Sequence, residues 1–193
     1  MTATSTDADL DILRRIAVRD ETALADLFDR HSRLVYSVIM RILRNPSDAE
    51  DVLQEAFVRV WNRADSYDAR LGSPGAWLMR IARNRAIDRL RAMRVRSAIS
   101  VDAGAGGDQA VRLTEPRTHE TPEALLQATD TSGALRTAMA ALPDGQRMLI
   151  EAAFFEGYTH HELAARFELP LGTVKTRIRA GLTAMRVRLE QVA

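Results

Sequence analysis

The chain has 193 residues, enough for one or two domains, and it balances 27 Lys and Arg against 26 Asp and Glu for a formal net charge of +1. Cysteine is absent, which excludes disulfides, thiolate metal sites and thiol redox sensing. Neither an apolar run long enough to span a membrane nor a signal-peptide pattern occurs, so we expect a soluble cytoplasmic protein.

The charges are segregated along the chain. Seven arginines and a single acid, Asp88, lie between Trp77 and Arg96, whereas the stretch 48–55 contains four acids and no base. This segregation predicts separate surfaces, one for a polyanion and one for a basic partner.

Helical periodicity begins at Leu10 and continues to Leu43, where Asn45-Pro46 ends the pattern. Ser47 and Glu50 have capping-box spacing and predict the start of the next helix. The inner side of that helix is apolar and consists of Val52, Leu53, Ala56, Phe57, Val60 and Trp61. Its outer side presents Asp48, Asp51, Gln54 and Glu55, which periodicity alone describes as a solvated acidic face.

A loop from Ala64 to Pro74 contains Tyr67, and Trp77 is expected to open the following helix. Helical spacing groups several residues on one basic side of this helix: Arg80, Asn84, Ile87, Arg91 and Arg94, with Arg83 beside them. Cations next to the two aromatic rings suit single-stranded nucleic acid, which needs both phosphate neutralisation and stacking surfaces. The alternative is that Trp77 is a core residue, and we expect at least part of its ring to be buried.

Residues 97–122 are rich in Gly and Pro and have little apolar periodicity, so they predict a flexible linker between domains at 1–96 and 123–193. Helical signals resume at Glu123, and Pro143 is expected at the start of a helix that runs to Gly157. Strand-like alternation of useful length is missing from the sequence. The predicted fold is therefore all-α, with two small helical domains.

Two helical patterns meet at a tight turn in the second domain. Thr159 and Glu162 have capping-box spacing, which predicts a helix from His160. Pro170 interrupts it and predicts a second helix from about Leu171. Two short helices across such a turn have the layout of a helix-turn-helix DNA-binding domain.

The second of these helices has one apolar stripe that we expect to be buried: Val174, Ile178, Leu182, Met185 and Leu189. Thr173, Thr176 and Ala180 lie opposite, flanked by Lys175, Arg177 and Arg179. Small and hydroxyl side chains between cations suit the DNA major groove. An ordinary solvated helix is the alternative, but the coincidence of cap, proline turn and basic strip favours DNA binding.

A catalytic or metal site is not indicated. His161-Glu162 begins like a zinc-protease motif, but Ala165 stands where the second histidine ligand is required. A nucleophile paired with a base cannot be named, so we expect neither an enzyme nor a cofactor. His31 and His119 are lone histidines, expected to be structural or exposed.

Three motifs resemble the extracytoplasmic-function (ECF) sigma factors, the minimal members of the sigma-70 family. They are DAEDVLQEAF at 48–57, WLMRIARNRAID at 77–88, and ALP at 141–143 together with GTVKTR at 172–177. The resemblance covers nearly the whole chain, and the three motifs occur in the right order, each on its expected helix. Ala180 and Gly181 depart from the family pattern, since many relatives carry arginine or another large residue there. The promoter sequence that this helix recognises therefore cannot be inferred from those relatives.

The resemblance implies an alternative sigma factor that directs promoter-specific initiation by core RNA polymerase. It assigns docking on the polymerase clamp helices to Asp48, Asp51, Gln54 and Glu55. It assigns contacts with the promoter −10 element to Tyr67, Trp77, Arg80, Arg83, Asn84, Asp88 and Arg91. It assigns contacts with the −35 element to Thr173, Lys175, Thr176, Arg177 and Arg179.

The resemblance also implies that the linker threads the polymerase channel and that an anti-sigma factor, often membrane-anchored in relatives, is a partner. A small-molecule ligand is not expected. A free-standing helix-turn-helix regulator is the competing hypothesis, but it explains only residues 158–189. A nucleic-acid-processing enzyme would need a carboxylate or metal constellation, which Asp88 alone does not supply.

Overall fold

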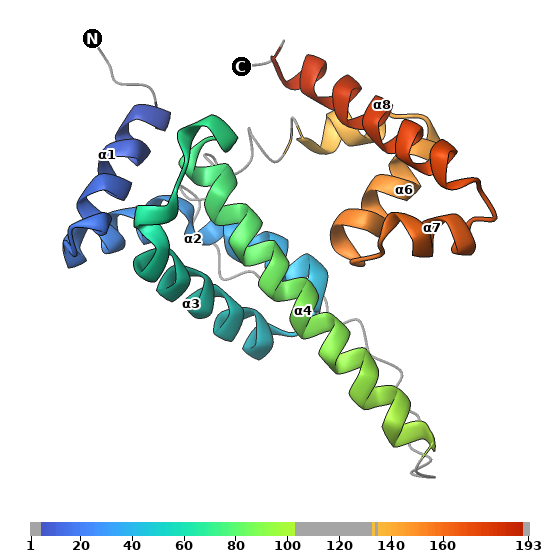
Figure 1. Cartoon of the computed structure of the whole chain (residues 1–193), viewed down its shortest axis with the longest axis horizontal. Coiled ribbons are helices and arrows are strands. Elements are labelled where there is room, and N and C mark those ends of the chain that lie inside the picture. Colours follow the sequence, from blue (N-terminus) through green and yellow to red (C-terminus); the bar gives the residue numbers. More distant parts are fainter. Residues whose placement is uncertain (1–4, 103–132, 134, 191–193) are drawn as a thin grey trace. The chain divides into compact units, whose positions relative to one another are not determined.

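A computed structural model describes residues 5–102, 133 and 135–190 (Figure 1). The regular secondary structure of these residues consists of α-helices and 3-10 turns, which confirms the predicted all-α fold. The chain divides into two compact units, Met1–Thr114 and Glu115–Ala193, each described here by itself. Most of the predicted linker 97–122 lies outside the described residues, so the domain boundaries at 1–96 and 123–193 stay predictions.

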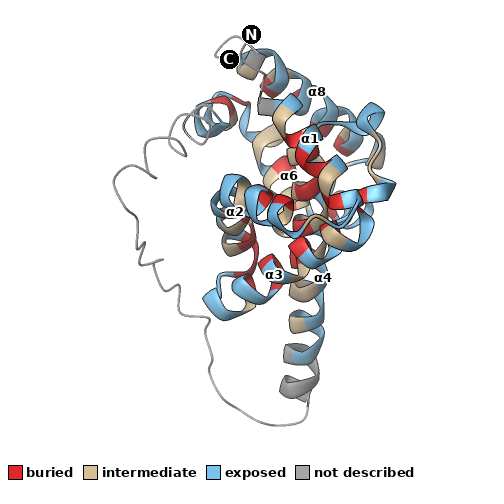
Figure 2. Ribbon diagram, turned by 90° about the vertical axis from the view of Figure 1, so that its left-hand side faces the viewer, coloured by how far each residue is buried: buried red, intermediate tan, exposed pale blue. Residues whose placement is uncertain are grey.

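The first unit consists of four helices and two short turns: α1 (Ser5–Ala17), α2 (Glu21–Leu43), α3 (Pro46–Arg63), the 3-10 turns η1 (Ala64–Ser66) and η2 (Ala69–Leu71), and α4 (Pro74–Asp102). Helices α2, α3 and α4 each pack against the other two, and α1 contacts all three. Figure 2 marks the buried parts of the ribbon, and the residues buried in this unit are apolar except for Asp9 and Pro74. The largest fully buried ones are Ile16, Leu27, Ile39 and Leu78.

The turn between α2 and α3 corrects the sequence prediction. Ser47 was expected to cap α3, but Asn45 does so, and its side-chain oxygen accepts a hydrogen bond from the backbone N–H of Asp48 at 3.2 Å. Pro46 occupies the first helical position, where a missing N–H leaves no hydrogen bond unmade. The proline therefore begins the new helix, and the cap is the residue in front of it.

The start of α4 follows the same rule. The helix begins at Pro74 and not at Trp77, because Ser73 caps it: Ser73 Oγ accepts from the backbone N–H of Ala76 at 3.3 Å, and the Ser73 carbonyl accepts from the N–H of Trp77 at 3.0 Å. At its other end the helix continues to Asp102, beyond the predicted end at Arg96.

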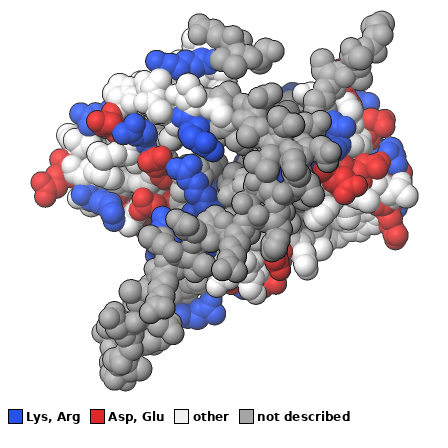
Figure 3. Space-filling view, turned by 180° about the vertical axis from the view of Figure 1, so that it is seen from behind, with Lys and Arg blue, Asp and Glu red and all other residues white. Residues whose placement is uncertain are grey.

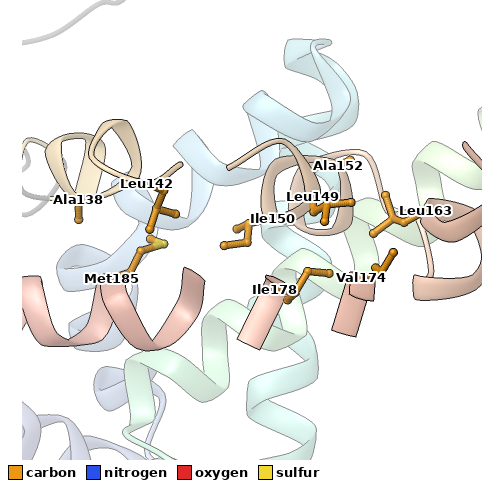
Figure 4. Close-up of a cluster of buried hydrophobic side chains, with 9 residues drawn as sticks. All are labelled: Ala138, Leu142, Leu149, Ile150, Ala152, Leu163, Val174, Ile178 and Met185. Carbon is orange, nitrogen blue, oxygen red and sulfur yellow. The ribbon is translucent and has the colours of Figure 1, made fainter. Parts of the chain in front are cut away.

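The second unit contains α6 (Asp144–Phe155), α7 (His160–Arg166) and α8 (Leu171–Glu190), preceded by a helical stretch at 135–140. Pro143 precedes α6 as predicted, and α6 ends at Phe155, short of Gly157. Both α6 and α7 pack on α8. Figure 4 shows the apolar side chains of α6 and α8 pointing toward one another, joined by Leu163 of α7.

The helix-turn-helix is confirmed, with α7 starting at His160 and α8 at Leu171. Thr159 Oγ1 accepts from the backbone N–H of Glu162 at 3.2 Å, while the Glu162 carboxylate accepts from the N–H of Thr159 at 2.6 Å, completing the predicted capping box. The reversal after α7 uses Glu168 in the left-handed region at φ 52°, a conformation that sequence pattern did not predict.

The buried stripe of α8 differs from the prediction at Leu182, and Leu189 at its end is only half-buried. Leu182 is 51% exposed, and Gly181 is buried in its place, next to Val174, Ile178 and Met185. A Cβ atom at Gly181 would lie 2.6 Å from Ile150 Cδ1 and 3.3 Å from Gln146 Cβ. The absent side chain therefore lets α8 approach α6 closely, and Gly181 is a packing residue rather than a DNA-contacting one.

We predict that Gly181→Leu destabilises the second unit by about 1–3 kcal/mol, because the added side chain must displace Ile150 and Gln146 of α6. Both tryptophans, Trp61 and Trp77, lie in the first unit. In urea unfolding, the part of the transition seen by circular dichroism that belongs to the second unit should therefore move to lower urea concentration, while the transition seen by tryptophan emission should not move. Ala180→Leu, at the exposed neighbouring position, adds a comparable side chain and should leave both transitions unchanged. Equal effects of the two substitutions would contradict this packing role.

Candidate nucleic-acid and protein interfaces

The outer side of α8 carries the residues that the sequence predicted for DNA contact. Lys175, Thr176, Arg177 and Arg179 are exposed, whereas Thr173 is half-buried. Buried Val174 and Ile178 on the opposite side hold the helix on the core of the unit. The helix thus presents three cations and a hydroxyl to solvent from a fixed backbone, a combination that fits major-groove recognition.

Arg177 lies at one edge of this surface. A Cβ atom built on Gly145, in the first turn of α6, would be 3.4 Å from its terminal nitrogen Nη1. The guanidinium therefore extends over the start of α6, where the backbone N–H groups of a helix favour an anion.

The polar side of α4 is narrower than predicted. Arg80, Asn84, Asp88 and Arg91 are exposed, but Ile87, which helical spacing placed with them, is only 6% exposed. The reason is tertiary: α4 contacts α1, α2 and α3, so its buried surface is wider than one apolar stripe. Ile87 is accordingly a core residue.

Arg83 lies beside this polar side and is half-buried. Its Nη1 donates a hydrogen bond to the Asn84 side-chain oxygen at 3.5 Å. Burial, followed by the positive charge of Arg91, lowers the pKa of the Arg83 guanidinium. The positive charge of Arg91 near the Arg83 guanidinium favours an anion at this place, as a phosphate backbone would supply.

Tyr67 and Trp77 pack against each other. Their ring centroids are 5.6 Å apart at an interplanar angle of 67°, and both residues are half-buried. The Tyr67 hydroxyl donates to the carbonyl oxygen of Gly72 at 2.8 Å. The pair therefore braces the loop between α3 and α4, and stacking of DNA bases on these rings stays a prediction.

The acidic face of α3, defined as Asp48, Asp51, Gln54 and Glu55, is not the isolated surface that the sequence predicted. Asp51 and Gln54 are exposed, but Asp48 and Glu55 are half-buried. Arg89 Nε donates to Asp48 Oδ1 at 2.8 Å, and Arg89 Nη2 donates to Asp51 Oδ2 at 3.3 Å.

Glu55 has a partner on the same neighbouring helix. Its Oε2 accepts from Arg85 Nε at 2.9 Å and also from Arg85 Nη2. Two arginines of the basic stretch 77–96 thus neutralise acids of α3. The space-filling view likewise shows acidic and basic side chains interspersed rather than separated (Figure 3).

The equal spacing of the arginines and of the acids is the sequence signal that could have revealed these ion pairs. Arg85 and Arg89 are one helical turn apart, as are Asp51 and Glu55, so antiparallel helices can align the two rows. The sequence alone did not show that α3 and α4 are neighbours, and the pairing was therefore missed.

Asp9 is a buried carboxylate outside these surfaces, only 4% exposed. It accepts a hydrogen bond from Arg30 Nε at 2.9 Å and lies 2.8 Å from His31 Nε2. His31 thus joins α1 to α2 and has the structural role considered from sequence, while His119 lies outside the described residues. Among the described residues, neither a metal-binding group of His, Asp and Glu nor a helix long and apolar enough to cross a membrane is found.

An all-α unit with an arginine-bearing helix, followed by a helix-turn-helix unit, is an arrangement typical of DNA-binding proteins. The family model for sigma-70 region 2 matches residues 27–96, and that for sigma-70 region 4 matches residues 138–187. The chain is also 35% identical over 182 residues to the ECF RNA polymerase sigma factor SigK of Mycobacterium sp. (strain KMS), covering 94% of this chain and 90% of the relative. The chain therefore belongs to the sigma-70 family, and within it to the ECF group.

Two further similarities have comparable coverage. The ECF RNA polymerase sigma factor SigK of Mycolicibacterium vanbaalenii is 34% identical over 180 residues, covering 93% of this chain and 88% of the relative. The solved structure of Rhodobacter sphaeroides SigE in complex with the anti-sigma ChrR matches with 30% identity and a TM-score of 0.46, covering 95% of this chain and 98% of that one.

We predict that Tyr67→Ala destabilises the first unit by about 0.5–1.5 kcal/mol or more, the contribution of an aromatic pair beyond its buried area. Tyr67→Phe keeps the ring contact, loses only the hydrogen bond to Gly72, and should have a smaller effect. Urea unfolding followed by tryptophan emission measures both. Leu71→Ala, at a residue 71% exposed in the same loop, is the control. A Tyr67→Ala effect no larger than that of Leu71→Ala would show that the pair does not brace the loop.

Proposed function

We propose that this chain, an alternative sigma factor by its family, uses three surfaces to direct promoter-specific initiation. The acidic face of α3 docks on the clamp helices of core RNA polymerase, the polar side of α4 with the adjoining loop binds the −10 element, and the outer side of α8 binds the −35 element. The observation that carries the proposal is that each family match falls on the unit that bears the corresponding surface.

Polymerase docking is supported by the arrangement of α3. Its apolar side is buried in the first unit, with Val52, Ala56 and Val60 almost wholly inaccessible, so the opposite side faces outward on a rigid backbone. Asp51 keeps 57% of its side chain exposed although Arg89 contacts it. A basic partner can therefore reach this carboxylate, and complementary charge speeds and orients such an encounter.

Strand opening is assigned to α4 and the loop before it. An unpaired base must be held by new contacts, because unstacking costs a few kcal/mol. Asn84 is exposed and carries both an amide donor and a carbonyl acceptor, as base-edge recognition requires. Arg80, Arg83 and Arg91 are placed to hold the flanking phosphates.

An anti-sigma factor is proposed as the regulatory partner, and the sigma factor itself is proposed to act in the cytoplasm. The chain has no cysteine, so a thiol switch of its own is excluded. Family membership supports control by a partner protein, and a small-molecule ligand is not expected. The competing hypothesis of a free-standing regulator does not account for a similarity to a sigma factor that extends over 94% of the chain.

Run-off transcription with purified core polymerase tests the proposed function. Promoter-specific initiation that requires this chain is expected. Binding of a palindromic site by the chain alone, with no initiation in the presence of core, would favour the free-standing regulator instead.

We predict that Asp51→Lys costs several kcal/mol of affinity for core polymerase, because like charges then face each other at the contact. Equilibrium binding of labelled core to the immobilised chain measures this effect. Asp29→Lys, at an exposed position of α2, makes the same charge change elsewhere and should bind normally. Wild-type affinity of Asp51→Lys would remove the basis for the α3 assignment.

At the −35 element, Lys175→Ala or Arg177→Ala in the holoenzyme should cost roughly 1–3 kcal/mol of binding. If the lost contact is to a phosphate, all sequences weaken alike and the salt slope falls by about one. Arg188→Ala, near the end of the same helix, serves as the control. Unaltered binding by both alanine variants would mean that α8 meets DNA with another face.

Asn84→Ala is expected to leave −35 binding nearly normal and to impair capture of the non-template −10 strand, because the base-edge contact is lost. Permanganate reactivity of promoter thymines in the holoenzyme complex reports opening directly. Asn62→Ala, an exposed asparagine of α3, provides the matched control. Opening at the wild-type level by Asn84→Ala would overturn the assignment.

A further inference from the structure

We infer that Arg85 and Arg89 of α4 restrain docking on core RNA polymerase, because they occupy the α3 carboxylates that a basic partner must contact. The inference rests on the proposed docking role of α3 and adds an internal competitor to it. The free chain would then hold its docking surface partly neutralised, and removing either arginine's charge would strengthen binding.

Arg89 is the stronger competitor. Its Nε and Nη2 atoms lie 2.8 and 2.7 Å from Asp48 Oδ1, and Nη2 also reaches Asp51 Oδ2 at 3.3 Å. The side chains of Arg89 and Asp48 are 34% and 20% exposed, so solvent screens this pair less than it screens Asp51. One cation thus serves two of the three carboxylates on the acidic face.

Arg85 makes the second contact, with Glu55. The two side chains are 39% and 40% exposed, so the pair lies at the surface, where an approaching partner can replace either member. Three carboxylates are therefore balanced by two guanidinium groups, and the remaining negative charge is centred near Asp51. A basic partner at this face meets two like charges well within a Debye length of about 8 Å.

A positioning role is the alternative, in which the arginines hold the carboxylates in the geometry that the partner requires. The backbone of α3 does not need that help, because Val52, Ala56 and Val60 already fix the helix in the core. Surface ion pairs also contribute little to stability, about 0–1 kcal/mol in the median case. The two roles predict opposite signs: positioning arginines raise the affinity for polymerase, and competing arginines lower it.

The experiment compares the binding of core polymerase by Arg89→Gln, Arg85→Gln and the wild-type chain at low and at physiological ionic strength. We expect each variant to bind about two- to fivefold more tightly, the range of a single exposed charge pair, with a smaller gain at the higher salt. Weaker or unchanged binding by both variants would overturn the inference. Circular dichroism verifies that each variant is folded, and Arg89→Met, which keeps the aliphatic stem, replaces a variant that is not.

Two controls separate charge competition from other effects. Arg59→Gln removes a positive charge from an exposed position of α3 outside these pairs, and it should bind less tightly than Arg89→Gln does. Arg89→Lys keeps the charge and should bind like the wild type. If Arg59→Gln gains as much as Arg89→Gln, the effect is one of net charge and the inference fails.

Asp51→Asn distinguishes failure of the inference from failure of the proposed function. If Asp51→Asn binds core normally, α3 is not the docking surface and both fail together. If Asp51→Asn weakens binding but Arg89→Gln does not strengthen it, docking stands and only the competition is refuted. In the combined variant Asp51→Asn with Arg89→Gln, the gain should shrink, because one of the two carboxylates released by Arg89 is gone.

Discussion

The packing of α4 against three other helices is the constraint on which the first unit depends. Leu78, Ala82 and Ala86 are buried on this helix, and the two alanines let neighbouring helices approach closely. The same helix carries every residue assigned to the −10 element except Tyr67. Its orientation, and therefore the position of every one of those side chains, is set by core packing and not by the polar residues themselves.

A close helix contact has the same function in the second unit. Gly181 allows α8 to lie against Ile150 of α6, and this contact fixes which side of α8 faces solvent. A larger residue would move or rotate the helix and with it Lys175 and Arg179. The glycine at this position is thus explained by packing, and residues that select the promoter sequence have to be sought on the exposed side of the helix.

Local signals in the sequence were sufficient to predict the helices but not to predict which helices pack against one another. The capping box at Thr159, the proline turn and the apolar stripes predicted the helix-turn-helix, and the all-α fold followed from periodicity. The caps at Asn45 and Ser73 were missed because a proline at the first helical position was interpreted as a stop signal. Ile87 and Leu182 were misplaced because burial there depends on which helices pack alongside, information that a single helix does not contain.

Predicting the charge of each surface also requires knowing which helices are neighbours. The arginines between Trp77 and Arg96 were considered one basic surface, yet Arg85 and Arg89 turn to α3 while Arg80 and Arg91 are exposed on the polar side. The segregation visible along the sequence is therefore partly cancelled in space, which narrows both the acidic and the basic surface. Because a weak, exposed ion pair is easily exchanged, the same contact that reduces the free charge of α3 can yield to a partner with a denser positive charge. In the proposed docking mode, affinity at this face is consequently a difference between two competing sets of ion pairs, and substitutions on α4 can change it without altering any carboxylate.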